Sequence, residues 1–449
     1  MARHRQRGRG ARHGASQSAA QRTKKARKAK ALPPAMVPIE ELSPTGEGVG
    51  KLDGRAVFVA GTLPGEVAYV EPRGGGVLRG RLLSLAACSE QRVEPSCPHH
   101  DACGGCDWMH VAVEAQAEHH VARVQALLGR AFGKAVTIER VHRPDPPLGY
   151  RTRARLSAVG TSSGVRVGYR RERSHRVAEV ASCGVLHPAL DALVPRLASW
   201  LVGSEGQGGV TLALGAEERP TLELRWEGEL GTGVVGALTG AVAEGSLRGA
   251  RLWPEGAHQP IDYGDPRGQV LGADRMPMWV APGGFAQASS RGGAALGARV
   301  VELVQVDGPP GRTVELFAGC GTFSVGLAAV AERLEAVEEI GEAVEVLRGN
   351  VTSRGLSVKA VAANANERTI SPATRTVVLD PPRAGAAGAC ARILEARPHQ
   401  IVYVSCDAVT LARDAALLAQ GGFVPRELEL FELFAQTHHV ETVLRLVRG

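Results

Sequence analysis

The strongest constraint on the fold of this chain is the regular alternation of short apolar segments with helical segments from about residue 290 onward. The apolar segments have the length and β-branched composition of buried strands, and their alternation with helices predicts a parallel, doubly wound α/β sheet. In such sheets ligands bind beyond the carboxyl ends of the strands. The predicted strands are residues 313–317, 334–338, 376–379 and 401–404, and the predicted helices are residues 322–331, 342–348 and 410–419.

The first of these strands runs into a glycine-bearing loop, Gly319-Cys-Gly321, and then into a helix. Glycines there let the backbone approach a ligand closely, and the N-terminus of the helix favours an anionic group. Glu338 ends the next strand, where a carboxylate can bind the hydroxyls of a ribose. The loop has no Gly-Lys-Ser/Thr, which argues against a phosphate-binding P-loop. The pattern therefore predicts a cofactor that contains adenosine.

Asp380 follows the third predicted strand and is itself followed by Pro381, Pro382 and Arg383. The two prolines restrict the backbone and carry no N–H donor, so they present the Asp380 carboxylate rigidly at the end of the strand. Enzymes that methylate the amino group of adenine typically place an aromatic residue after such an Asp-Pro-Pro, where it stacks on the base. Arg383 at that position disfavours chemistry on an exocyclic amine.

Cys406 follows the fourth predicted strand, in the sequence Tyr-Val-Ser-Cys. A single cysteine is most often a small buried hydrophobic residue. Its position at the carboxyl end of a strand, beside the cofactor loop and Asp380, favours a nucleophile instead. The C-terminal segment that contains His438, His439 and Glu441 offers a base for such a thiol, although the pattern around Glu441 also fits a solvated strand residue.

A separate group of three cysteines lies within ten residues: Cys97, Cys103 and Cys106. In a reducing compartment such spacing indicates metal ligands, and thiolates favour zinc or an iron–sulfur cluster. Zinc would recruit His99 or His100, whereas a cluster would need a fourth cysteine, for which Cys183 is available. Chance proximity of structural cysteines is the third interpretation.

The N-terminal region differs in composition from the rest of the chain. Residues 1–31 contain eleven Lys or Arg residues and no acid, so the remainder holds 42 basic against 46 acidic residues, a net charge of −4. Such a segment predicts a disordered arm that attracts nucleic acid, or else a solubilising extension. Short strands broken by glycines then predict a β-barrel of about five strands. We therefore divide the chain into a tail (1–35), a barrel (36–92), a mixed α/β central domain (93–285) and the α/β sheet domain (286–449).

The sequence also predicts a cytoplasmic protein. The longest uncharged stretch, residues 316–331, is shorter than the roughly 18–20 residues of a membrane span. The N-terminus lacks the apolar core of a signal peptide. Eight cysteines among 449 residues are too few for a disulfide scaffold, so we expect reduced thiols.

Together these motifs resemble the RNA uridine C5-methyltransferase family, whose members use S-adenosylmethionine to make 5-methyluridine in ribosomal and transfer RNA. The resemblance covers nearly all of the chain after the tail and implies a Rossmann-like methyltransferase domain at the C-terminus. It also implies that the barrel is an RNA-binding TRAM domain. The similar segments are residues 47–55 and 63–66 of the TRAM-like barrel, 97–106 with Cys183 of a four-iron–four-sulfur site, and 149–153 with 174–175 of the central domain.

The resemblance implies a role for individual residues. Cys406 would be the nucleophile, Glu441 the general base, and Asp380 would face both the cofactor and the uracil. The residues that would line the S-adenosylmethionine site are Gln287, Phe317, Thr322, Glu338, Asn364 and Asp380. The ligands of a [4Fe–4S] cluster would be Cys97, Cys103, Cys106 and Cys183. The implied partner is RNA, ribosomal rather than transfer RNA because the layout is more similar to those members, and we expect a monomer.

The chemistry of the family implies that the Cys406 thiolate adds at C6 of uracil, that C5 then takes the methyl group, and that Glu441 removes the C5 proton. The target base must leave its stack, so we expect a looped or flipped nucleotide. The cluster has no step in this chemistry, because the methyl donor is already an electrophile. We therefore expect it to brace the central domain through Cys183.

Two positions depart from the family pattern. Asp407 is followed by Ala408 where the family usually has a proline, and Ser289 stands where it usually has an asparagine. The first change would loosen the loop that carries Cys406, and the second removes an amide donor and acceptor near the substrate. Two other functions stay open. One is a cytosine C5-methyltransferase, which would normally carry Pro-Cys and a second nearby cysteine, and the other is a non-catalytic RNA-binding or folding protein on a degenerate methyltransferase body.

Overall fold

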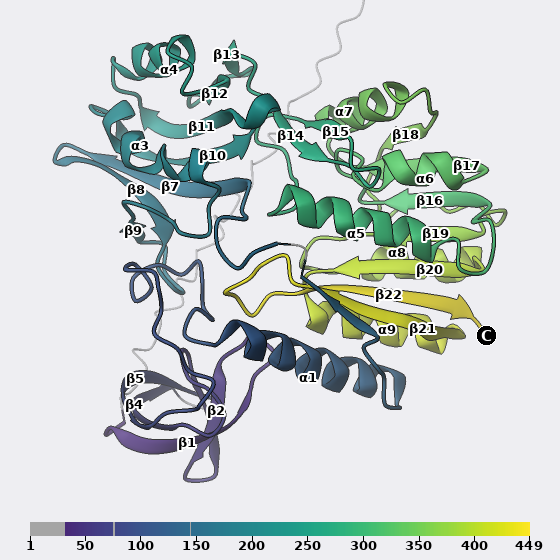
Figure 1. Cartoon of the computed structure of the whole chain (residues 1–449), viewed down its shortest axis with the longest axis horizontal. Coiled ribbons are helices and arrows are strands. Elements are labelled where there is room, and N and C mark those ends of the chain that lie inside the picture. Colours follow the sequence, from purple (N-terminus) through teal and green to yellow (C-terminus); the bar gives the residue numbers. More distant parts are fainter. Residues whose placement is uncertain (1–31, 75–76, 144) are drawn as a thin grey trace, which may run out of the picture.

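The computed structural model describes residues 32–74, 77–143 and 145–449, which form a small barrel, a seven-stranded sheet with a two-stranded ribbon, and an eight-stranded sheet (Figure 1). The predicted basic tail falls almost entirely on residues 1–31, which lie outside the described residues. In Figure 1 the barrel lies below the seven-stranded sheet, and the eight-stranded sheet lies to the right of both. No helix within the described ranges is long and apolar enough to cross a membrane.

Five strands form the closed barrel, in the order β1-β2-β3-β5-β4. Apolar residues alternate along these strands and point inward, where Val37, Val57 and Val70 are fully buried. The predicted barrel is therefore confirmed. Its strands are β1 (Ala35–Leu42), β2 (Gly48–Leu52), β3 (Arg55–Val59), β4 (Val67–Gly74) and β5 (Leu78–Ala87).

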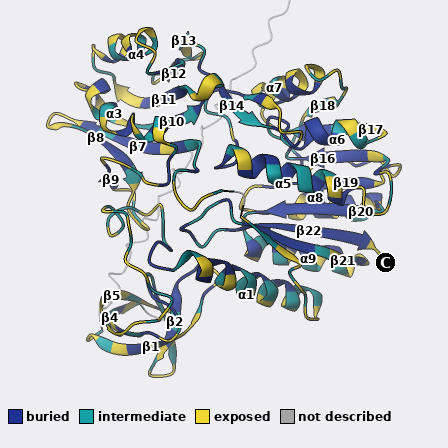
Figure 2. Cartoon of the chain, viewed as in Figure 1, coloured by how far each residue is buried: buried dark blue, intermediate teal, exposed yellow. Residues whose placement is uncertain are grey.

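The seven-stranded sheet has the order β13-β12-β11-β10-β7-β8-β9. Helices α2, α3 and α4 contribute to one apolar core with the strands, in which Leu197 and Leu238 meet Leu156, Leu212 and Trp226. Figure 2 shows buried and exposed residues interleaved along these strands, as expected for a sheet with one covered face. The elements are β7 (Arg153–Thr161), β8 (Gly164–Arg170), β9 (Val177–Glu179), α2 (Pro188–Asp191), α3 (Val194–Trp200), β10 (Glu205–Leu214), β11 (Pro220–Glu229), α4 (Val234–Ala243), β12 (Gly249–Trp253) and β13 (Ile261–Gly264), followed by the ribbon of β14 (Gly268–Leu271) and β15 (Pro277–Val280).

The eight-stranded sheet has the order β18-β17-β16-β19-β20-β22-β21-β6, and its first five strands are parallel. Residues of α8 and α9 pack in one apolar cluster, whereas those of α5, α6 and α7 pack in two others, so helices cover both faces. The doubly wound prediction is confirmed. The elements are α5 (Ser290–Leu303), β16 (Arg312–Leu316), α6 (Ser324–Val330), β17 (Arg333–Glu338), α7 (Gly341–Thr352), β18 (Lys359–Ala362), β19 (Thr376–Leu379), α8 (Ala387–Ala396), β20 (Gln400–Ser405), α9 (Ala408–Gln420), β21 (Phe423–Phe431) and β22 (Glu441–Arg448).

Two elements from the N-terminal half join this C-terminal sheet. Helix α1 (Val113–Phe132) packs beside α9 and ends at Gly133, whose φ of 65° is the left-handed conformation that glycine adopts without strain. Strand β6 (Arg140–His142) pairs in parallel with β21 and adds an edge strand to the sheet. β6 was not predicted, because three residues carry no readable periodicity.

Candidate active site

Neighbouring strand ends gather four predicted site residues at one edge of the eight-stranded sheet. Glu338 is the last residue of β17, Asp380 follows β19, and Cys406 follows β20. Glu441 is the first residue of β22 and reaches the same edge because β22 runs antiparallel to β20. Strands that are distant in sequence thus bring a thiol and three carboxylates together.

Glu338 holds the glycine loop after β16. Its Oε2 accepts a hydrogen bond from the Gly319 N–H at 3.0 Å, and its Oε1 accepts one from the Ile340 N–H at 2.9 Å. Phe317 has a φ of 61°, a left-handed conformation rare outside glycine that marks a constrained loop. At Gly319 no atom lies within 4 Å of the place a Cβ would take, so the loop borders open space. This open cradle, with a carboxylate and the 62% exposed Ile340 at its rim, fits a nucleoside.

The other two predicted cofactor residues lie around the same loop. The hydroxyl of Thr322 contacts the sulfur of Cys320 at 3.9 Å, inside the loop itself. Asn364 lies just after β18 and next to Ala363, whose N–H donates to the Glu338 carbonyl at 2.9 Å. Thr322 therefore belongs to the glycine loop, and Asn364 lies next to a residue that is bonded to Glu338.

Gln287 joins the segment before α5 to the strand edge. Its Nε2 donates to the Asp380 Oδ2 at 3.2 Å, while its buried Oε1 has no hydrogen-bond partner among the described residues. An unsatisfied buried acceptor is costly, which makes this oxygen a place for a ligand donor. Ser289, two residues on, is the N-cap of α5 and accepts from the Gly292 N–H at 2.9 Å. The serine that departs from the family pattern therefore stabilises a helix start.

Asp380, Cys406 and Glu441 form an acidic group in which Glu441 is buried and the other two side chains are half-buried. Burial raises the pKa of Asp380 to about 7, and burial followed by the Asp380 charge raises the pKa of Glu441 well above its usual range. Burial, then Glu441 and Asp380, raise the pKa of the Cys406 thiol to about 12. One Glu441 oxygen, Oε2, is buried without a partner among the described residues. The group therefore holds protons at rest and is poised to exchange them with a bound base.

Arg383 places a cation against this group. Its charge lowers the pKa of both Cys406 and Glu441, in opposition to the larger effect of burial. Its Nη2 also lies 3.1 Å from the Nε2 of His439. Burial, followed by the charges of His438 and Arg383, lowers the pKa of His439 to about 3, so His439 is neutral and accepts this hydrogen bond. Of the three candidate bases, Glu441 is the one that faces the thiol.

The loop that carries Cys406 is held without the expected proline. Asp407 is the N-cap of α9, and its Oδ1 accepts from the Thr410 N–H at 2.8 Å. The Asp407 N–H in turn donates to the Ser405 hydroxyl at 3.2 Å. These bonds hold both ends of the turn that carries Cys406.

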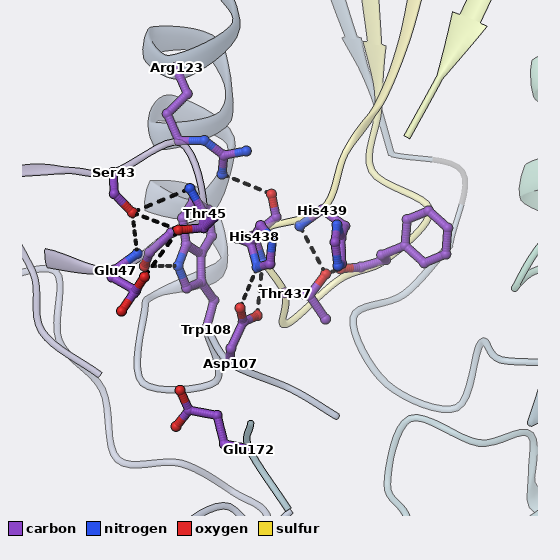
Figure 3. A network of polar contacts seen from close by, with 12 residues as sticks. Ser43, Thr45, Glu47, Asp107, Trp108, Arg123, Glu172, Thr437, His438 and His439 are labelled. Atoms are coloured by element: carbon purple, nitrogen blue, oxygen red, sulfur yellow. Dashed lines mark hydrogen bonds and ion pairs between the residues drawn. The ribbon is translucent and has the colours of Figure 1, made fainter. Parts of the chain in front are cut away.

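The segment 432–440, which leads into Glu441, is held from outside the sheet (Figure 3). Asp107 accepts from the His438 N–H at 3.0 Å and also contacts the ring nitrogen Nδ1 of His438. Arg123 of α1 donates to the His438 carbonyl at 2.8 Å. Asp107 directly follows Cys106 in sequence, so the cysteine segment and α1 both restrain the approach to Glu441.

Trp108 and Gln116 extend this contact to the barrel. The Trp108 indole N–H donates to the Gly46 carbonyl at 2.9 Å, and its backbone N–H donates to the Gln436 carbonyl at 2.9 Å. Gln116 accepts from the Gln436 N–H at 3.0 Å and donates to its side-chain oxygen at 3.2 Å. Sequence reasoning missed all of these residues, because partners some 320 positions apart leave no local pattern.

The four predicted cluster ligands line one cavity: Cys97, Cys103, Cys106 and Cys183. His100 also lines it, and its buried Nδ1 has no partner among the described residues. Burial raises the pKa of the Cys106 thiol to about 12, so this thiol needs a cation beside it to bind as a thiolate. Within the described ranges, no set of three or more His, Cys, Asp or Glu side chains is arranged to hold a metal ion. The four cysteines therefore have the chemistry to bind a metal or cluster as thiolates, while the described residues show no metal centre.

Two family profiles match the chain. The tRNA (uracil-5-)-methyltransferase profile matches residues 370–449, which include Asp380, Cys406 and Glu441, and the TRAM domain profile matches residues 36–71. The 23S rRNA (uracil(1939)-C(5))-methyltransferase RlmD of Halomonas elongata is 32% identical over 91% of this chain and 88% of its own length. The protein of the same name from Edwardsiella ictaluri is 32% identical over 91% of this chain and 94% of its own length.

The fold is also that of a solved structure. The Pyrococcus abyssi tRNA (uracil-54, C5)-methyltransferase, crystallised with S-adenosyl-L-homocysteine, superposes with a TM-score of 0.69. The match covers 92% of this chain and 100% of that one at 23% sequence identity. At this identity the likeness concerns the fold, and it confirms the predicted architecture.

Proposed function

This chain belongs to the RNA uridine C5-methyltransferase family, and from that premise we propose that it methylates C5 of a uridine in 23S ribosomal RNA, with S-adenosylmethionine as the methyl donor. Both relatives described above are named for 23S rRNA, which supports ribosomal over transfer RNA. The observation that carries the proposal is the group of Cys406, Asp380 and Glu441 beside the open glycine loop. A thiol, two carboxylates and a nucleoside cradle are the parts that addition–elimination at a pyrimidine requires.

Cys406 is proposed as the nucleophile. C5 of uracil is a poor nucleophile until a group adds at C6, so the Cys406 thiolate forms an S–C6 bond and the electrons of the C5=C6 bond move toward C5 and the O4 carbonyl. C5 uses this electron pair to bond the methyl group of the donor, and the electrons of the broken S–CH3 bond would stay on the sulfur of the donor, which would leave as a neutral thioether. Because Cys406 rests as a thiol, its proton passes to the Asp380 carboxylate when uracil enters, which leaves the Glu441 carboxylate for the C5 proton; the charges of both carboxylates act on this thiol.

Glu441 is proposed as the base that ends the reaction. It takes the proton from C5, the electrons of that C–H bond re-form the C5=C6 bond, and Cys406 leaves as a thiolate. Its raised pKa makes its carboxylate a stronger base than an exposed glutamate. Asp380, held by Gln287 at 3.2 Å, orients the uracil ring by hydrogen bonding.

The glycine loop is the proposed site for S-adenosylmethionine, which supplies an electrophilic methyl group when bound. Glu338 would accept hydrogen bonds from the ribose hydroxyls, because its two oxygens already line the cradle. Phe317 and Thr322 would border the cofactor, and Asn364 would lie near the adenine. Gln287 would use its unpartnered Oε1 on the cofactor while its amide nitrogen stays on Asp380.

Nucleoside mass spectrometry on 23S rRNA fragments, combined with active-site variants, tests the proposal. Cys406→Ala should abolish formation of 5-methyluridine, whereas Cys88→Ala, at an exposed cysteine, should leave it unchanged. Glu441→Gln should transfer the methyl group but release the product slowly, so a covalent protein–RNA adduct should accumulate on a denaturing gel. Methylation by Cys406→Ala would exclude this mechanism. Detection of 5-methylcytidine in place of 5-methyluridine would favour a cytosine methyltransferase. Detection of no methylated nucleoside would favour the non-catalytic RNA-binding protein.

We also propose that the four cysteines bind a [4Fe–4S] cluster. Support comes from the shared cavity and from the thiolate chemistry of such clusters, which need one cysteine for each iron. The protein purified without oxygen should contain about four irons per chain and absorb visible light. Cys183→Ser should lose this absorption while Cys88→Ser retains it. One zinc per chain, or no metal, would replace this proposal with one of the two other interpretations.

A monomer in the reducing cytoplasm is the proposed working form. All eight cysteines are free, which is typical of proteins that are not exposed to an oxidising compartment. Light scattering during gel filtration should give a mass near 47.1 kDa for the chain. A mass of twice that value would exclude the monomer.

A further inference from the structure

We propose that the face of the seven-stranded sheet turned away from its helices binds the phosphate backbone of the RNA and leads it to the active site, through Arg155, Arg166 and Arg170. The proposal rests on the RNA substrate named above and adds the surface on which that RNA lies. It does not depend on the roles of Cys406 or Glu441.

Strand pairing places the three arginines on one face. Leu156, Ala158 and Val167 point into the core shared with α3 and α4, so the residues between them point the other way. Ser157 pairs with Gly168, and Val159 pairs with Arg166. The same alternation places Arg155 on β7 and Arg170 on β8 on the outer face, just beyond the last residues that the two strands pair. All three arginines are exposed.

These arginines differ from others on the same face because none of them forms an ion pair with a described carboxylate, although the exposed Glu179 of β9 lies across from Gly168 on that face. Arg225 pairs with Glu223 at 2.8 Å, and Arg251 pairs with Asp262 at 2.8 Å. Among the residues that the structure describes, Arg155, Arg166 and Arg170 form no ion pair, and Arg170 instead donates to the Ser157 hydroxyl at 3.4 Å. The guanidinium of Arg155 lies over Gly209, where a Cβ would be 3.8 Å from its Nε.

Like charges across neighbouring strands destabilise a sheet unless an anion lies between them. Arg155 and Arg170 lie on one face of these neighbouring strands, and burial together with the Arg155 charge also lowers the pKa of Arg153. The chain after residue 31 carries a net charge of −4, so this concentration of unpaired positive charge is local rather than general. Phosphate groups bound between the arginines would remove the repulsion among them. A nucleic-acid backbone carries phosphates at regular spacing and can therefore supply one beside each arginine.

The turn between β8 and β9 continues the same surface. Arg171 and Arg176 are exposed and form no ion pair with a described carboxylate, while Arg173 is bound to Glu47 of the barrel at 2.5 Å. The Arg173 contact anchors the turn on the TRAM-like barrel. The free arginines on either side of it therefore bridge the sheet face and the barrel.

The other end of the surface reaches the active site. Arg153, on the same face of β7, donates to the Gly283 carbonyl at 2.9 Å. Gly283 is followed by Phe285, whose side chain is 65% exposed, and then by Gln287, which binds Asp380. An exposed aromatic ring between a basic track and a catalytic pocket is suited to stack on an unpaired base as the strand enters. A protein partner would gain little from this arrangement of single, unpaired charges.

The salt dependence of RNA binding tests this surface in the full chain. The probe is 23S rRNA transcribed in vitro, and the variant carries Arg155→Gln, Arg166→Gln and Arg170→Gln together. The slope of log K against log[salt] should fall in magnitude by between about two and three, because each lost phosphate contact changes it by roughly 0.7 to 0.9. The KM for RNA should rise while kcat at saturating RNA stays within about twofold.

Three further variants make the result decisive. Arg225→Gln, at a neutralised arginine on the same face, should leave the slope unchanged. Replacing the same three arginines by lysine should retain it, and Arg166→Gln alone should lower it by about one if the triple variant does not fold. An unchanged slope in the triple variant, or an equal loss in Arg225→Gln, would overturn the proposal. If the wild-type protein binds this RNA but does not methylate it, the substrate named above is wrong and the surface is still tested by the slope.

Discussion

Asp107 and His438 join the cysteine segment to the catalytic edge of the sheet, because the Asp107 carboxylate accepts from the His438 N–H at 3.0 Å and contacts the His438 ring nitrogen. Asp107 directly follows Cys106, and His438 precedes the proposed base Glu441 by three residues. Through this contact the cysteine segment can affect the position of active-site residues, although it takes part in no chemical step. Whatever orders residues 97–106 also restrains the segment that delivers Glu441.

Asp107→Asn should therefore impair the step that depends on Glu441. Asparagine has no negative charge and only one acceptor oxygen, so it cannot replace both contacts of Asp107 with the His438 nitrogens. The segment 432–440 should then be held less firmly, and Glu441 should shift. A displacement of about 1 Å at a reacting group costs on the order of 100-fold in rate, so we expect kcat to fall by between about tenfold and 100-fold. The covalent RNA adduct should accumulate, as in Glu441→Gln.

Asp101→Asn is the matched control, since Asp101 is an exposed acid in the same cysteine segment. It should change neither kcat nor adduct level. Iron content and circular dichroism should be equal in both variants. A fall in kcat without adduct, or a parallel loss of iron, would show that Asp107 supports the fold of its segment rather than the position of Glu441.

The local parts of the fold and site were predictable from the sequence. Glu338, Asp380 and Cys406 each end or follow a short apolar strand, and parallel strands deliver their carboxyl ends to one edge by geometry alone. The residues that sequence reasoning missed act through distant contacts. Gln116 and Gln436 are 320 residues apart and make two hydrogen bonds, a relationship that no periodicity or spacing encodes.

The two departures from the family pattern also show what sequence motifs cannot predict. The sequence predicts that Ala408 loosens the loop of Cys406 and that Ser289 removes an amide near the substrate, because motifs report which residue is usual, not what it contacts. In the structure Asp407 caps α9 and Ser289 caps α5, so local hydrogen bonds hold both positions. Whether a substitution is tolerated depends on the bonds available to it, which become visible only in three dimensions.

Glu338→Gln should weaken cofactor binding. The carboxylate accepts from the Gly319 and Ile340 N–H groups, and hydrogen bonds to a charged acceptor contribute about 1.5–3 kcal/mol. The amide loses one acceptor and the charge, so the Kd for S-adenosylhomocysteine should rise by roughly tenfold or more in isothermal titration calorimetry. Glu339→Gln, at the exposed neighbouring position, should bind as the wild type does. Equal affinity in both variants would remove Glu338 from the cofactor site.

Asp414→Ala should destabilise the fold around the nucleophile. The fully buried Asp414 accepts from the Tyr403 hydroxyl and the Ala386 N–H, both at 2.7 Å, and so ties β20 to the loop after Asp380. Alanine leaves these two buried donors without an acceptor, and at about 1–3 kcal/mol each this should cost about 2–6 kcal/mol in the free energy of unfolding measured with urea. Glu395→Ala, at an exposed ion pair on α8, should cost less than about 1 kcal/mol. A small effect at Asp414 would mean that water or another donor pair satisfies this site.

The pH dependence of methylation follows from the raised pKa values of Asp380 and Glu441. The reaction requires a carboxylate that can accept a proton, and burial raises the pKa of Asp380 to about 7, so below that pH the pair is protonated and inactive. The single-turnover rate should therefore still be rising with pH near pH 7, unlike that of a site with ordinary carboxylates, which would be level from about pH 5. Gln287 donates to Asp380 and lowers its pKa, so Gln287→Leu should move the midpoint of the rise to higher pH. A flat profile between about pH 5 and 8, or a midpoint that moves down in Gln287→Leu, would show that this pair does not accept the proton in the rate-limiting step.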